Sequence, residues 1–164
     1  MPSNLLTIEQ VMPLLTENPQ RIAALIADLA PSQLHTPPGG PDGWSINDVL
    51  AHLRACADVW GNCMMTMIAE DMPTLRAINP RTWIKKTNYL ELEFQPSLRS
   101  FAMQRADLLA VLAPLPPEGW SRAATVTGAG KVLRRTVLFY GQWLASHERQ
   151  HVKQVERMVK ALPV

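Results

Sequence analysis

Two histidines four residues apart, His147 and His151, are the clearest chemical feature of this chain of 164 residues. Side chains at positions i and i+4 of an α-helix are neighbours, with Cβ atoms about 5–6 Å apart, so both imidazoles can reach one ion. Neutral imidazole is the commonest side-chain nitrogen ligand for Zn²⁺, Ni²⁺, Cu²⁺ and Fe²⁺. Two buried imidazoles without partners would be costly, whereas a shared metal ion would satisfy both. The pair therefore indicates a metal site.

A third ligand has to come from elsewhere in the chain. His52 lies on or near the apolar stripe of an earlier predicted helix, one turn before Cys56. If the two helices pack together, three imidazoles converge and leave coordination positions open for water or substrate, as catalytic metal sites require. His35 lies in a connector rich in proline and glycine and is left unassigned. Cys56 stays open as an additional ligand, although cysteines at helical spacing usually fill a core.

The segment His147–His151 also matches the pattern H-E-x-x-H of zinc peptidases, in which the glutamate, here Glu148, is the general base. Such peptidases usually take their third ligand downstream, and no histidine follows His151. Glu148 is also one position away from the two histidines, about 100° around the helix. We keep Glu148 as a candidate catalytic base and regard a peptidase as the less favoured interpretation.

Both histidine-bearing segments read as long helices. Ser45 and Asp48 predict a capped helix start, and the apolar spacing continues to about Glu70. The last helix is predicted over residues 133–161, with an inward stripe at helical spacing. The members of this stripe are Leu133, Val137, Tyr140, Leu144, His147, His151, Val155, Met158 and Leu162.

Two further helices complete the expected architecture. A helical region over residues 7–29 is expected to be kinked or split at Asn18 and Pro19, and another helix spans roughly 88–112. Residues 120–131 form either an extended loop or a small hairpin. Four helices and little strand signal predict an all-α four-helix bundle, one domain over residues 1–164. Connectors of about 12 residues or more imply long crossover connections.

Composition excludes several functional classes. With 47% hydrophobic and 18% charged residues, the chain is expected to be globular. The net charge of +2 and the absence of long basic runs argue against nucleic-acid binding. No apolar stretch reaches the roughly 18 residues needed for a membrane span. Cys56 and Cys63, too far apart on one helix for a disulfide, and the absence of a secretory signal predict a cytoplasmic protein.

Two segments resemble motifs of the DinB/YfiT-like superfamily. The segment Gly43–Leu53, G-W-S-I-N-D-V-L-A-H-L, is similar to its second-helix motif, and His147–Gln154, H-E-R-Q-H-V-K-Q, to its last-helix motif. The layout of residues 105–120 is similar too. The resemblance implies a bundle of DinB/YfiT type, often a homodimer, with a divalent metal bound by one histidine of the second helix and two of the fourth. Here these are His52, His147 and His151.

The resemblance also implies a class of chemistry. Members with known activity are metal-dependent transferases or isomerases that use low-molecular-weight thiols, and others are regarded as hydrolases. We therefore expect an enzyme with Zn, Ni or Fe that acts on a small molecule. The metal would activate a thiol cosubstrate, for S-transfer or isomerisation of an electrophile, or water for hydrolysis. A non-catalytic metal-binding stress-response protein is the main alternative, and a purely structural helical protein is the third.

Overall fold

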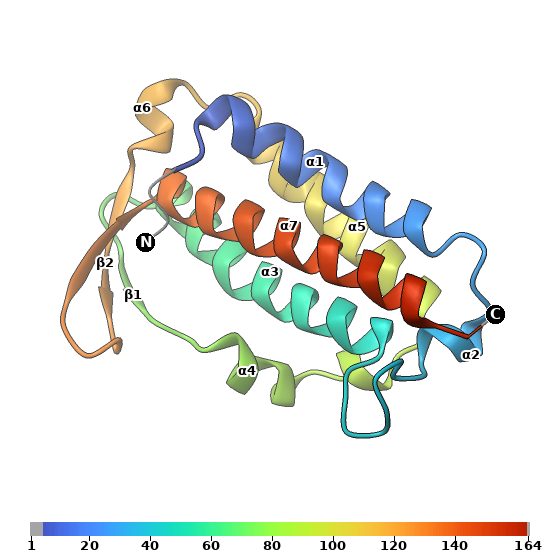
Figure 1. The fold of residues 1–164 in the computed structure, drawn as a ribbon. Coiled ribbons are helices and arrows are strands. Elements are labelled where there is room, and N and C mark those ends of the chain that lie inside the picture. Colours follow the sequence, from blue (N-terminus) through green and yellow to red (C-terminus); the bar gives the residue numbers. More distant parts are fainter. Residues whose placement is uncertain (1–4, 164) are drawn as a thin grey trace.

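Four long helices dominate the computed structural model, which describes residues 5–163. They are α1 (Ile8–Leu25), α3 (Ile46–Ala69), α5 (Phe94–Leu112) and α7 (Val137–Ala161). Helix α1 packs against α7 and α5, and α3 packs against the same two helices, so α1 and α3 occupy opposite corners of a bundle. Helices α1 and α7 run in one direction and α3 and α5 in the other (Figure 1). The predicted all-α four-helix bundle is confirmed.

The parallel course of α3 and α5 requires a crossover along the bundle (Figure 1). This connection holds β1 (Thr74–Arg76), α4 (Pro80–Trp83), and the 3₁₀ turns η1 (Ile84–Lys86) and η2 (Tyr89–Glu91). The short helix α2 (Pro31–Leu34) lies between α1 and α3. None of the helices within residues 5–163 is both long and apolar enough to cross a membrane.

A small sheet closes one end of the bundle. Between α5 and α7 the chain forms α6 (Pro117–Trp120), β2 (Ala123–Thr127) and β3 (Leu133–Thr136). Strand β2 pairs antiparallel with β3 and parallel with β1. The hairpin alternative for residues 120–131 is therefore the one observed. The predicted start of the last helix at residue 133 is wrong, because residues 133–136 pair with β2 and Thr136 caps α7 by accepting from the Phe139 amide at 3.1 Å.

Two other predicted boundaries differ in the structure. The first helix is continuous from Ile8 to Leu25 and contains Pro13 and Pro19, so the split expected at Asn18 does not occur. Pro19 cannot donate to the carbonyl of Leu15, four residues earlier. Arg105 of α5 donates to that carbonyl instead, at 2.9 Å. The third long helix begins at Phe94 rather than near residue 88, because η2 precedes it.

The start of α3 is capped as the sequence predicts. The Ser45 hydroxyl accepts from the Asp48 amide at 3.1 Å, and the Asp48 carboxylate accepts from the Ser45 amide at 2.8 Å. This reciprocal cap defines the helix register about two turns before His52. It therefore determines which face of α3 carries that histidine toward α7.

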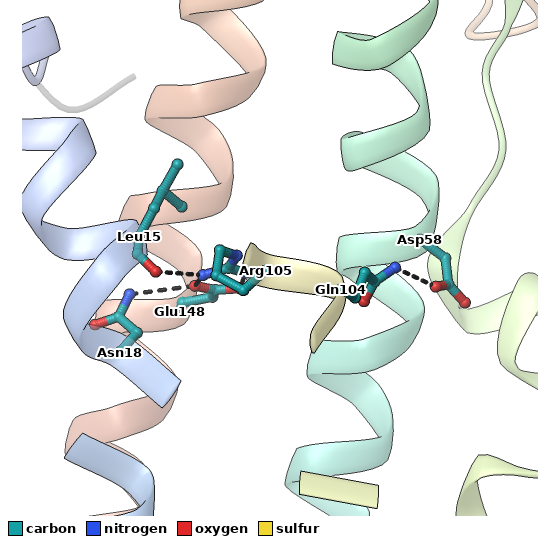
Figure 2. A network of polar contacts seen from close by, with 6 residues as sticks. All are labelled: Leu15, Asn18, Asp58, Gln104, Arg105 and Glu148. Atoms are coloured by element: carbon teal, nitrogen blue, oxygen red, sulfur yellow. Dashed lines mark hydrogen bonds and ion pairs between the residues drawn. The ribbon is translucent and has the colours of Figure 1, made fainter. Parts of the chain in front are cut away.

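A buried polar layer divides the core into two apolar clusters. Arg105 of α5 donates to both carboxylate oxygens of Glu148 of α7, and Asn18 of α1 donates to the same carboxylate at 3.2 Å (Figure 2). The exposed fractions of Arg105 and Glu148 are only 3% and 0%. Because buried charges need partners, this layer favours one alignment of the three helices. The clusters on its two sides include Ile22, Leu53, Phe101 and Val155, and Val11, Met64, Leu108 and Leu144.

Candidate metal centre

The packing of α3 against α7 brings the three predicted histidines together. The Nε2 atoms of His52 and His147 are 3.2 Å apart, and those of His147 and His151 are also 3.2 Å apart. Ligand atoms of all three rings lie within 4.8 Å of one another. Two nitrogens bound to one tetrahedral zinc ion would stand about 3.3 Å apart. The side chains are half-buried, so the cluster has both protein packing and an open side.

The electrostatics of the cluster favour neutral rings. Burial, followed by repulsion from His151, lowers the pKa of His52 to about 4 and that of His147 to about 3. Both rings are therefore neutral near pH 7, and each has one nitrogen lone pair. Lone pairs that face each other at 3.2 Å repel unless a proton or a cation lies between them. The residues present thus fit a divalent ion.

Gln154 orients one of the three rings. Its Oε1 lies 2.6 Å from Nδ1 of His151 and accepts the proton of that nitrogen. The Nε2 lone pair of His151 is consequently directed toward the other histidines. Such partners of ligating histidines select the tautomer and raise the basicity of the ring. By contrast, Nδ1 of His147 is buried and has no hydrogen-bond partner among the residues that the structure describes.

Cys56 approaches the cluster from one side. Its Sγ is 3.6 Å from Nε2 of His52, but the three mutually close ligand atoms belong to the histidines alone among the described residues. Burial, followed by the negative charge of Glu148, raises the pKa of this thiol to about 12. Because the thiolate is the ligating form, Cys56 is a poor additional ligand in this environment.

Glu148 follows His147 in the chain but faces away from the histidine cluster. The most buried positions of α7 include Leu144, Glu148, Val152 and Val155, so the inward stripe passes through Glu148. The predicted stripe is therefore displaced in this half of the helix, and the histidines lie on its flank. Arg105 and Asn18 donate to the Glu148 carboxylate. This candidate base is therefore bonded within the core and does not face an open site.

Sequence reasoning missed three tryptophans around the cluster. The ring of Trp44 is centred 5.3 Å from that of His52, and the ring of Trp60 is 5.1 Å from that of His147. Trp143 packs edge-on against Trp60 at 5.7 Å. The spacing of Trp143 four residues before His147 was a usable signal, because such positions share a helix face. Trp44 precedes α3, so no periodicity relates it to His52.

A second feature, a groove of about 810 Å³, lies between α3, α5 and the crossover segment. None of the three histidines lines it. The Asp58 carboxylate in this groove accepts from Trp83 at 2.9 Å, Tyr89 at 2.6 Å and Gln104 at 2.6 Å; Figure 2 includes the Gln104 contact. These bonds fasten the crossover to α3. The carboxylate in this groove thus already has partners within the protein, unlike the ligand nitrogens of the histidine cluster.

Known protein families and solved structures include relatives of this chain. A family model of the DinB superfamily matches residues 14–155, a range that includes all three histidines. The chain belongs to the DinB superfamily. Among solved structures, it is similar to YfiT from Bacillus subtilis, described as a probable metal-dependent hydrolase with an unusual four-helix bundle topology. The TM-score is 0.77 at 18% identity, over 98% of this chain and 91% of YfiT. No curated protein matches the chain.

The likeness to YfiT shows that this DinB-superfamily chain has the same four-helix bundle fold. The predicted recognition of the DinB/YfiT type is confirmed by both comparisons. At this level of identity, the reaction has to be argued from the side chains of this protein.

Proposed function

We propose that this DinB-superfamily protein is a metal-dependent enzyme whose divalent ion is held by His52, His147 and His151. One observation carries the proposal: three imidazoles from two helices present mutually close nitrogens. Burial keeps His52 and His147 neutral, and Gln154 orients His151. Zn²⁺, Ni²⁺ and Fe²⁺ all accept such a set of ligands.

The proposed reaction begins with nucleophile activation on a small molecule. A bound divalent ion would lower the pKa of a thiol or of water, and so supply a nucleophile at neutral pH. The three side chains would hold and orient the ion while leaving its remaining positions open. We favour S-transfer or isomerisation with a low-molecular-weight thiol, or hydrolysis as described for YfiT. We assign no base function to Glu148, because Arg105 engages its carboxylate.

Metal analysis and a thiol panel test the proposal. Protein purified without added metal or chelator is expected to bind Zn²⁺, Ni²⁺ or Fe²⁺ at one ion per chain in titrations. His151→Ala should lose this ion, whereas the matched control His35→Ala, in the connector beside Glu93, should retain it. Absence of any binding by the unaltered protein would refute the metal site.

A non-catalytic metal-binding protein is the second candidate, because no carboxylate group belongs to the close cluster among the described residues. Turnover of model electrophiles with thiols, or of ester and amide substrates, should depend on His151 if the protein is an enzyme. Retained metal without any His151-dependent turnover would favour the second candidate. The superfamily resemblance also leads us to propose a homodimer, which sedimentation velocity would test.

A further inference from the structure

The histidine cluster is continuous with a row of aromatic rings. We name Trp44, Trp60, Trp143 and Phe139 the aromatic rim. Trp44 contacts the ring of His52 at one end of the cluster, and Trp60 contacts the ring of His147 at the other. Beyond Trp60 the row continues to Trp143 at 5.7 Å and then to Phe139 at 5.6 Å. The ligand candidates thus lie between two aromatic surfaces.

The outer members of the aromatic rim remain accessible. Trp44 is 41% exposed and Trp143 is 44% exposed, whereas Trp120, which fills the core, is 2% exposed. Tryptophan offers a large apolar surface for ligand contact. Trp44 lies against His52, and Trp143 is joined to His147 through Trp60, so a small ligand at the site can extend over one of the exposed rings.

The charges near the rim define the polar part of that ligand. At the Phe139 end of the rim, the guanidinium of Arg135 lies over the ring of Phe139, 4.5 Å from its centre. A divalent ion held by the three histidines would add positive charge within the row. Together these charges favour a ligand with an anionic or electron-donating group.

We propose that the aromatic rim binds an aromatic group of the substrate, while an anionic or electron-donating head group of the same molecule reaches the histidine site. This inference rests on the proposed function and deepens it by naming the substrate class. Stacked and edge-on aromatic pairs contribute beyond their buried area, so aromatic substrates are selected over small aliphatic ones. Trp44 and Trp143 are the specificity-determining residues.

Matched hydroxamates on the Zn²⁺-loaded protein test this inference by calorimetry. Benzohydroxamate and acetohydroxamate share one metal-binding head group and differ in the ring. We expect benzohydroxamate to bind about tenfold more tightly or better. One phenyl ring cannot reach both ends of the cluster, so one of the variants Trp44→Ala and Trp143→Ala should weaken benzohydroxamate about fivefold and leave acetohydroxamate and Zn²⁺ affinity unchanged. If neither variant weakens benzohydroxamate, the inference is overturned. The control Trp83→Phe, outside the rim, should change neither hydroxamate. Metal analysis after titration verifies that the ion is retained.

The outcomes separate this inference from the proposed function. If the unaltered protein binds no Zn²⁺, the proposed function fails and this inference fails with it. If Zn²⁺ binds but the two hydroxamates have equal affinity, or the tryptophan variants weaken both equally, the inference alone is overturned. It is also overturned if Trp143→Ala converts a dimer to a monomer in sedimentation velocity without changing benzohydroxamate affinity, because the ring then serves a subunit contact.

Discussion

The histidine cluster and the buried polar layer meet at consecutive residues of α7 but have opposite properties. Glu148 is fully buried, and its carboxylate accepts from Arg105 and Asn18. His147 is half-buried, one ring nitrogen lacks a partner among the described residues, and the other faces two more imidazoles. A polar group whose hydrogen bonds are all made within the core, such as Glu148, therefore stabilises the fold. The ring nitrogens of the half-buried histidine cluster, in contrast, are available to bind a ligand.

The polar layer is also integrated with the backbone. Arg105 neutralises the charge of Glu148. It also donates to the Leu15 carbonyl, which has no helical partner because Pro19 lacks an amide hydrogen. The histidine cluster also lies between two helices, α3 and α7, but its side chains are half-buried instead of fully enclosed. Substitutions in the layer should therefore affect stability, and substitutions in the cluster should affect metal binding.

The largest expected effect is on folding. Arg105→Ala leaves the Glu148 carboxylate buried without its cation, so the free energy of unfolding in urea should fall by about 3–5 kcal/mol. Replacing both partners, Arg105→Met with Glu148→Leu, removes both charges and should cost much less. If the single substitution cost under about 1 kcal/mol, the layer would not be the stabilising element that we describe.

Metal addition should stabilise the native protein next most strongly. Zn²⁺ at about 100 times its dissociation constant should raise the free energy of unfolding by about 2.7 kcal/mol, provided that only the folded state binds. His151→Ala should abolish this increase while changing the stability of the metal-free protein by less than about 1 kcal/mol. Thermal scans with and without chelator measure both quantities, and an equal response of the two proteins would contradict the assignment.

Gln154 should have a smaller effect that is confined to the cluster. Gln154→Ala removes the acceptor for Nδ1 of His151, so Zn²⁺ affinity should fall by about 10–100-fold. Gln154→Glu, which keeps an acceptor oxygen, should restore most of it. Competition with a chromophoric chelator gives the dissociation constants. Unchanged affinity in the alanine variant would show that packing alone orients the ring.

The effect that solvent screening reduces most is the pH dependence of the metal-free protein. The folded pKa values of His52, about 4, and His147, about 3, lie below the ordinary value of 6.5. Between these limits the unfolded chain binds more protons, so stability is present above pH 6.5 and is lost as the pH falls toward 3–4. Because the rings are half-exposed, solvent moderates the loss.

Urea unfolding across this pH range measures that loss. His147→Gln should make the pH dependence shallower, because it removes the group with the lower folded pKa. A variant curve parallel to that of the unaltered protein would contradict the assignment of the effect to this ring.

Much of the bundle follows from local patterns. The start and course of α3 can be predicted from the sequence, because the Ser45 cap and the helical spacing depend on contacts between residues a few positions apart. The hairpin strand at residues 133–136 was assigned to a helix, because its partner in β2 lies across a turn that periodicity does not describe. Likewise, the continuity of α1 through Pro19 depends on Arg105, far away in the chain.

The spacing of His147 and His151 is enough to place both on one helix face, because four residues make little more than one helical turn. The sequence also placed His52 on a helix capable of joining them. The contact of Glu148 with Arg105 and that of Trp44 with His52 become visible only once the helices are packed. Helix periodicity relates near neighbours in the chain, whereas the partner of a buried charge or of an aromatic ring depends on how whole helices pack.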